Sequence, residues 1–213
     1  MADLIIPALT ETLYMVFFST VFSLLLGFPL GVLLVITEKG SIWERKQLNR
    51  ILNGIINILR SFPFIILMIL LFPLSRLIVG KTIGTTATIV PLSIAAAPFV
   101  ARIIESSLKE VDKGIIECSL AMGASIPEIV FKVLIPESMP SLILGITTTI
   151  INIIGYSAMA GAIGGGGLGD VAIRYGLYRF QTDVMVVAVI VIIVIVQGIQ
   201  FIGNKLSSSI NKK

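Results

Sequence analysis

Five long stretches of this sequence carry no charged side chain, and this feature constrains the fold more than any other. They are residues 13–36, residues 61–75 with an uncharged approach at 51–59, and residues 82–101, 138–169 and 184–204. A bilayer core requires about 20 consecutive apolar residues per helical span. Lipid offers no partners for open backbone groups, so such stretches must be helices, and a β-barrel would show shorter alternating segments. The sequence therefore predicts an all-α polytopic membrane protein with five transmembrane helices, the whole chain 1–213 forming one domain.

The composition and the distribution of charge agree with a membrane protein. Hydrophobic residues make up 56% of the chain and charged residues 13%, which lies outside the range of soluble domains. Basic residues are richer in every second connection, which predicts an external N-terminus, a cytoplasmic segment 102–137 and a cytoplasmic C-terminus. The net charge of +4 is then an insertion signal, and no nucleic-acid partner is expected. The start lacks a basic n-region, so the first stretch is expected to stay as a span.

The segment 102–137 is polar and has its own helix signals. Asp112 is placed to cap a short helix, and Gly123 is placed to end it. The sequence from Ser125 to Glu128 is a capping-box pattern that begins a second helix, and Pro136 is expected to help end it. The pattern predicts a helical hairpin with a defined glycine corner.

Other local signals concern packing. Gly27 and Gly31 are spaced to let helices approach closely within the subunit. A second capping-box pattern at residues 41–44 predicts a helix that begins there and enters the second span. For Arg60, at the end of that helix, snorkelling to a nearby membrane edge is favoured over facing a wet cavity together with Asn57.

The fourth stretch ends in a glycine-rich run. Small residues recur every four positions at Ser157, Gly161, Gly165 and Gly169, which makes a close-packing stripe if the segment stays helical. The chain equally allows the helix to unwind near Gly164. In the third stretch, Pro98 interrupts the backbone hydrogen bonding, so this helix is a candidate wall of a pathway.

Catalytic and cofactor signals are weak. Residues 164–169 formally fit a dinucleotide fingerprint, but that fingerprint works only after a strand in a βαβ unit. The chain has no P-loop, no histidine and one cysteine, so we expect no catalysis, cofactor or metal site. Cys118 is interpreted as a small packing residue.

The polar segment resembles a known family. Five residues separate Glu117 from Gly123, and nine residues separate Gly123 from Val133-Leu-Ile-Pro136. This spacing resembles the EAA loop of permeases of ATP-binding cassette (ABC) importers, with Cys118 and Ser119 in place of the two alanines. Residues 53–180 also resemble the methionine importer permeases, through segments such as 57–65, 96–102 and 155–161.

The resemblance implies a type I ABC importer permease fold in a bacterial cell membrane. It implies a homodimer of this permease bound to two cytoplasmic ATPase subunits, with an extracytoplasmic binding protein that delivers a small amino acid. The residues that the resemblance assigns to ATPase coupling are Glu117, Cys118, Ser119, Ala121, Gly123, Ala124 and Pro136. Without the motif spacing, Glu117 would be interpreted as a solvated surface residue.

Candidate pathway residues lie in the third and fourth stretches. Met159 is flexible and apolar, so it is a candidate gate, and plain helix packing is the alternative. Tyr156 and Ser157 are candidates for polar contacts with a passing amino acid, and Pro98 for the pathway wall.

Other functions remain open from the sequence alone. A different cargo, either another apolar amino acid or a small peptide, fits the same class of permease. A secondary carrier acting alone is disfavoured because the span centres lack acidic groups. A membrane scaffold is the third alternative, and neither of these two explains the hairpin.

Overall fold

The computed structural model describes residues 1–211, and these residues form helices and turns without a strand. The long helices are α1 (Ala2–Ile36), α5 (Thr85–Leu108), α9 (Met139–Gly161) and α11 (Thr182–Ile210). The shorter α-helices are α2 (Lys46–Ser61), α3 (Phe64–Leu70), α4 (Phe72–Val79), α6 (Lys113–Ala121), α7 (Ile126–Ile129), α8 (Ile135–Glu137) and α10 (Gly167–Val171). Two π-helical segments, Val130–Leu134 and Ala172–Leu177, follow α7 and α10. The predicted all-α fold is confirmed.

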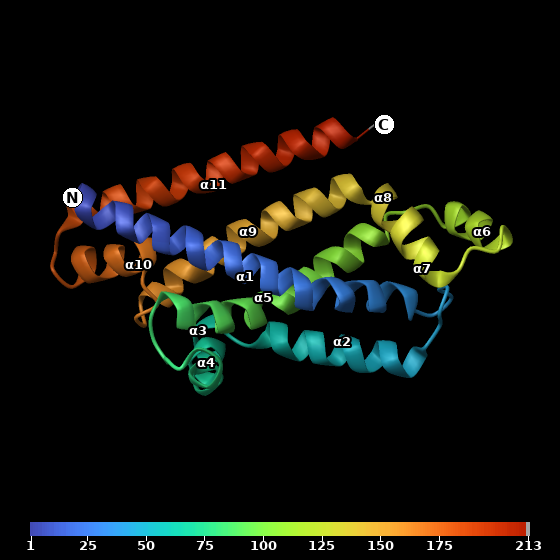
Figure 1. The fold of residues 1–213 in the computed structure, drawn as a ribbon, viewed down its shortest axis with the longest axis horizontal. Coiled ribbons are helices and arrows are strands. Elements are labelled where there is room, and N and C mark those ends of the chain that lie inside the picture. Colours follow the sequence, from blue (N-terminus) through green and yellow to red (C-terminus); the bar gives the residue numbers. More distant parts are fainter. Residues whose placement is uncertain (212–213) are drawn as a thin grey trace.

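The long helices run along one axis of an elongated bundle (Figure 1). The N-terminus and α10 lie at one end, whereas α6, α7 and the C-terminal end of α11 lie at the other. The four long helices are long and apolar enough to cross a membrane, and the pair α2–α3 qualifies as a fifth span only when counted together. The prediction of five spans therefore holds with one bent span.

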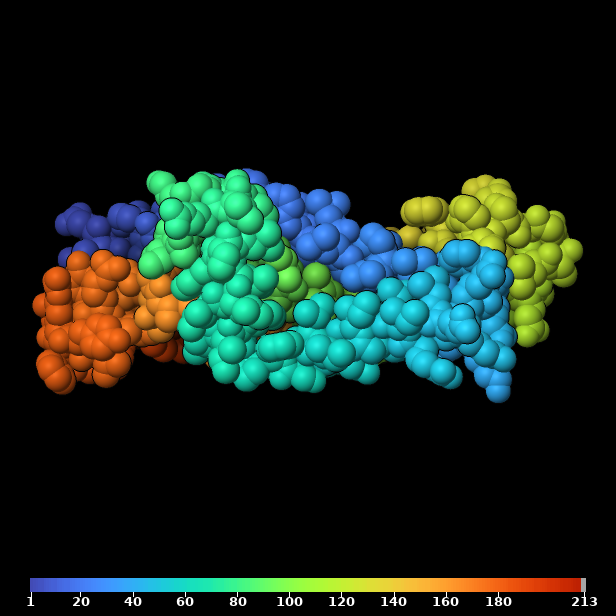
Figure 2. Space-filling model, turned by 90° about the horizontal axis from the view of Figure 1, so that it is seen from below, coloured from blue at the N-terminus to red at the C-terminus, as the bar shows by residue number. Residues whose placement is uncertain are grey.

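The bend lies at Pro63. α2 and α3 meet at an angle of 103°, because proline has no N–H to continue the ladder and disfavours a helical residue before it. α4 follows at once and is seen nearly end-on in Figure 1, so it runs across the bundle. Figure 2 shows α2 along one face of the molecule and the α3–α4 segment turning across this face at the end of α2. The uncharged run 61–75 is thus two short helices and not one straight span.

α2 begins at Lys46 and not at the predicted capping box. The carboxylate of Glu44 accepts a hydrogen bond from the Gly40 N–H at 2.8 Å, within a turn that precedes the helix. The polar and apolar faces of α2 point in different directions. Asn49 faces α1 and donates a hydrogen bond to the Leu34 carbonyl at 2.8 Å, whereas the apolar Ile55 is exposed on the outer face. An apolar outer face has no cost in a bilayer.

The core of the bundle is the contact between α1 and α5, the most extensive of all helix pairs. A Cβ added at Gly27 would lie 2.6 Å from the Ala97 carbonyl oxygen, and one added at Gly31 would lie 2.7 Å from that of Ala101. The two glycines therefore serve packing within the subunit, as the sequence predicted. α1 itself starts at Ala2, eleven residues before the predicted apolar stretch.

The fourth stretch does not remain helical throughout. α9 ends at Gly161, and a turn with positive φ at Gly164, Gly166 and Gly167 leads into α10. The predicted small-residue stripe is therefore broken, and the alternative of unwinding near Gly164 is the observed one. Gly161 still serves close packing, because a Cβ there would lie 2.5 Å from the Gly169 carbonyl carbon.

Candidate functional site

The predicted hairpin is present at one end of the bundle (Figure 1). The Asp112 carboxylate accepts a hydrogen bond from the Gly114 N–H at 2.6 Å and caps α6. At the corner, Gly123 has a φ of +83°, a conformation that glycine adopts at little cost. The Ala124 N–H returns to the Ser119 carbonyl at 3.1 Å and closes the turn. The corner is thus a hydrogen-bonded turn between two capped helices.

The second helix of the hairpin begins with the predicted capping box. The Glu128 carboxylate accepts hydrogen bonds from the Ser125 N–H at 3.1 Å and from the Lys132 ammonium at 2.9 Å. Lys132 and then Ser125 lower the pKa of Glu128 from its ordinary value of 4.5 to about 2. Glu128 is therefore charged at neutral pH and holds the entry of α7 in place.

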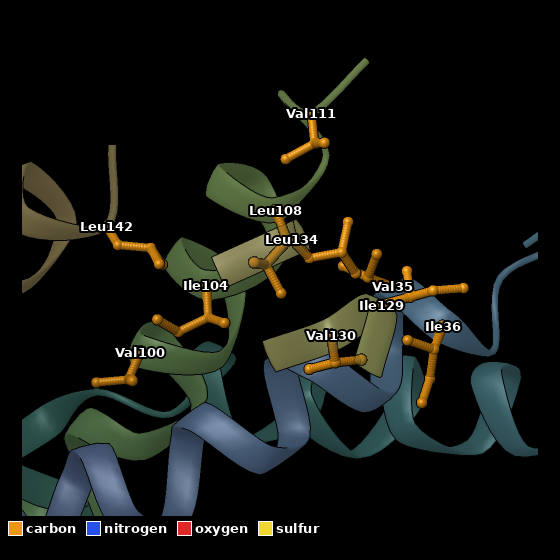
Figure 3. Close-up of a cluster of buried hydrophobic side chains, with 10 residues drawn as sticks. All are labelled: Val35, Ile36, Val100, Ile104, Leu108, Val111, Ile129, Val130, Leu134 and Leu142. Atoms are coloured by element: carbon orange, nitrogen blue, oxygen red, sulfur yellow. The ribbon is translucent and has the colours of Figure 1, made fainter. Parts of the chain in front are cut away.

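The hairpin is fixed to the bundle by a buried apolar cluster (Figure 3). Ile129, Val130 and Leu134 of the second helical arm pack with Val35 of α1 and Ile104 of α5. Each of the three arm residues is at most 5% exposed. Because buried cores do not deform continuously, a displacement of the hairpin must carry the ends of α1 and α5 with it.

The arm runs through Pro136 without ending there. The π-helical segment Val130–Leu134 precedes the proline, and the helical path continues through α8 to Glu137. The wider π turn accommodates proline, which has no N–H to donate. The prediction that Pro136 helps to end this helix was therefore wrong. Pro136 is exposed on the outside of this arm.

The other residues assigned to coupling are distributed over the hairpin as follows. Glu117, Cys118, Ala121 and Gly123 are exposed, Ala124 is half-buried against the apolar cluster, and Ser119 is buried and donates to the Ile115 carbonyl at 2.8 Å. Cys118 is therefore not a packing residue within the protomer. Glu117 borders a cleft of about 460 Å³ between α6 and the connection after α1.

Sequence reasoning missed the apolar part of the same surface. Met122, beside the glycine corner, is 81% exposed, and Phe131 on the second arm is 68% exposed. Ile115 and Leu120 of α6 are exposed as well. Such clustering of large apolar side chains on a polar hairpin is typical of a surface that contacts another protein. The amphipathic pattern of residues 115–122 was the available signal.

A polar network lies at the root of the hairpin. Arg102 donates to Glu105 at 2.6 Å and to the Asn57 side-chain carbonyl on α2 at 2.8 Å. Lys109 bridges Glu105 and Glu38, each at 2.9 Å. Burial lowers the pKa of Lys109, but its hydrogen bonds to both carboxylates outweigh burial and raise it. The network ties α2, α5 and the connection after α1 together.

The candidate pathway residues lie in two different environments. Tyr156 is half-buried and stacks on Phe64 of α3 with ring centroids 4.5 Å apart. Met159, one turn further along α9, is exposed. Ser157 is buried and donates to the Ile154 carbonyl at 2.7 Å, and Pro98 is buried inside α5. Tyr156 and Met159 are thus accessible in the protomer, whereas Ser157 and Pro98 are enclosed.

The glycine-rich turn after Met159 is held by α1. The Glu11 carboxylate accepts from the Gly167 N–H at 2.7 Å, and the Thr12 hydroxyl accepts from the Leu168 N–H at 2.9 Å. These bonds satisfy the first N–H groups of α10. Across residues 1–211, no group of three His, Cys, Asp or Glu side chains is arranged to hold a metal ion.

Comparisons with known proteins agree with this geometry. The family model described as "Binding-protein-dependent transport system inner membrane component" matches residues 27–208. The chain is 50% identical over 205 residues to the probable D-methionine transport system permease protein MetI of Vibrio cholerae, covering 96% of this chain and 91% of that protein. It is 48% identical over 203 residues to the methionine import system permease protein MetP of Bacillus subtilis, covering 95% and 91%.

Solved structures show the same fold. A chain of the inward-facing MetNI methionine ABC transporter superposes with a TM-score of 0.98 at 43% identity, covering 100% of this chain and 98% of that chain. A chain of an amino acid ABC transporter solved with histidines superposes with a TM-score of 0.73 at 21% identity, covering 97% and 92%. The second likeness concerns the fold alone.

Proposed function

The chain belongs to the family of binding-protein-dependent transport system inner membrane components, and on this premise we propose that it is the membrane-spanning permease subunit of an ABC importer of methionine. The observation that carries the proposal is the exposed, capped hairpin at one end of a five-pass helical bundle. The names of the relatives, with coverage above nine-tenths of this chain, support methionine as the cargo.

The proposed assembly is a homodimer of this permease with two cytoplasmic ATPase subunits and an extracytoplasmic substrate-binding protein. The whole chain acts as one permease domain, with residues 102–137 as its coupling loop. The N-terminus faces outward, and the hairpin and the C-terminus face the cytoplasm. The start of α1 and the end of α11 lie at opposite ends of the bundle, with the end of α11 on the hairpin side, and this placement supports the proposed orientation.

In the proposed mechanism, the ATPase binds the hairpin, and its movement changes the conformation of the helical bundle. The exposed faces of Glu117 and Met122 meet a groove on the ATPase, where Glu117 accepts a charge-assisted hydrogen bond. Closure of the motor displaces the hairpin, and the apolar cluster around Ile129 transmits the displacement to α1 and α5. The bundle then switches between discrete inward-open and outward-open arrangements. Met159 acts as the gate between the two permease subunits.

Reconstitution tests this function directly. Proteoliposomes with the permease, its cognate ATPase and its binding protein should take up labelled methionine only when ATP is supplied on the ATPase side. A panel of other apolar amino acids and small peptides should accumulate less. Preferential uptake of another cargo would replace methionine in the proposal, and uptake without ATP or ATPase would refute the class of transporter. The purified permease alone should hydrolyse no ATP.

A further inference from the structure

We propose that the cleft at the α2–α3 break is a substrate subsite of the permease that holds an amino acid by its carboxylate at Arg60. The cleft has a volume of about 170 Å³. Its lining includes Leu59, Arg60, Phe62, Phe64, Phe99 and Tyr156, from four different helical segments. The inference rests on the proposed function, because it takes the cargo to be an amino acid.

Arg60 is the first element of this inference. It forms no hydrogen bond or ion pair with any other residue of the described chain 1–211. The helical rise places it about 15 Å along α2 beyond Arg50, the charged residue that precedes it on this helix, which is about half of a bilayer core of about 30 Å. A cation at this depth is costly unless it pairs with an anion, and it typically marks a substrate pathway. This depth argues against the snorkelling interpretation favoured from the sequence.

Aromatic rings form the second element. Phe64 and Tyr156 stack with an angle of 10° between their planes, so α3 and α9 meet at this cleft. Phe62 and Phe99 add further apolar lining from the break and from α5. Aromatic faces and edges favour a polarisable thioether side chain as well as other apolar side chains. The apolar part of an amino acid is therefore accommodated beside the cation.

The break itself supplies the third element. Pro63 has no N–H, so the Leu59 carbonyl has no i+4 donor at the end of α2. The C-terminal end of a helix carries partial negative charge, which attracts an ammonium group. Discontinuous membrane helices supply such backbone groups at substrate sites. A carbonyl without its usual helical donor, an unpaired cation and apolar rings together match a zwitterionic amino acid.

The size of the cleft fits one small ligand. With about 30 Å³ per water molecule in the liquid, 170 Å³ corresponds to roughly six waters. Sites for drug-sized ligands are larger, at about 300–1,000 Å³. Tyr156 lies three residues before Met159, and such residues are neighbours on a helix surface. An occupied cleft thus touches the helix that carries the proposed gate.

Photolabelling of the permease–ATPase complex in lipid nanodiscs tests the subsite. The probe is the diazirine analogue of methionine, which keeps the carboxylate and the ammonium, and the labelled residues are located by mass spectrometry. We expect labels within residues 59–67, at Phe99 or at Tyr156. Methionine should compete at least about tenfold better than methioninol, which lacks the carboxylate.

Three variants sharpen the test. Arg60→Gln should reduce labelling of the cleft at least about tenfold, and Arg60→Lys, which keeps the charge, should label between this variant and the parent. Arg76→Gln is the matched control, because Arg76 is exposed on α4 outside the cleft and loses the same charge. This control should label like the parent protein.

The outcomes separate the two proposals. Labels only elsewhere, equal competition by methioninol, or parental labelling of Arg60→Gln would overturn the subsite while leaving ATP-dependent uptake by the parent protein intact. Absence of uptake by the parent protein would overturn the proposed function, and the subsite with it. Should Arg60→Gln fail to assemble with the ATPase, the competition ratio measured on the parent protein decides.

Discussion

Alanine at both Gly27 and Gly31 should force α1 away from α5. The added Cβ atoms would lie 2.6 Å from the Ala97 carbonyl oxygen and 2.6 Å from the Ile104 Cβ. Carbon atoms in contact are about 3.5–4.0 Å apart, so the two helices must separate by about 1 Å. The obstacles include backbone oxygens, which cannot rotate away as a flexible side chain can.

The cost follows from this separation. A radial gap of 0.5–1 Å forfeits about a quarter to a half of each dispersion contact along the pair. Overpacking of this kind costs about 1–3 kcal/mol per site, and the better helix propensity of alanine returns about 0.5–1 kcal/mol for each glycine. Taken over the two sites, overpacking costs about 2–6 kcal/mol and the alanines return about 1–2 kcal/mol, so we expect a net loss of roughly 1–4 kcal/mol in unfolding free energy.

Reversible unfolding of the purified permease in mixed detergent micelles measures this loss. The matched control is Gly54→Ala with Gly198→Ala, two helical glycines whose added Cβ atoms meet nothing within 4 Å. The control pair should be as stable as the parent protein or slightly more stable. If the Gly27/Gly31 variant unfolds at the same denaturant fraction as the control, the close-packing argument for α1 and α5 is wrong.

Three further outcomes concern the two ends of the bundle. Gly123→Pro should abolish ATP-dependent transport without loss of membrane insertion, since proline cannot adopt a φ of +83°; normal uptake would contradict the coupling role. Because the pKa of Glu128 is lowered to about 2 from 4.5, the stability that its charge gives the hairpin should be complete above pH 4.5 and lost as the pH falls through 2. Amide exchange of α7 should show this loss in the parent protein and not in Glu128→Gln, and equal protection at pH 5 and pH 2.5 would refute it. Glu11→Ala should weaken the first turn of α10 by about 0.5–2 kcal/mol, seen as faster exchange of the Gly167 and Leu168 amides, with Glu11→Gln close to the parent; unchanged exchange in Glu11→Ala would rule the cap out.

Local patterns in the sequence predicted the hairpin well. The cap at Asp112, the corner at Gly123 and the box formed by Ser125 and Glu128 each depend on residues within a few positions of one another. These interactions join residues that are close in sequence, so local patterns were sufficient to predict them. The roles of these residues in coupling remain predictions.

Features that depend on distant residues were not predicted. The cap of α10 comes from Glu11, 156 residues away from Gly167, and no local pattern connects them. The bend at Pro63 was missed because hydropathy does not distinguish one span from two short helices. The continuation through Pro136 depends on a π turn, which has no reliable sequence signature.

The groove that Gly27 and Gly31 form on α1 also bears on synthesis at the ribosome. Its partner helix ends at Leu108, about 70 residues later in the chain, and translation at about 5–20 residues per second needs roughly 4–14 s to reach that point. During those seconds the small-residue face of α1 and its Ser19 and Ser23 side chains, which are buried in the folded protein, have no packing partner from the same chain. Surrounding molecules must therefore cover this face of nascent α1 until α5 has been synthesised.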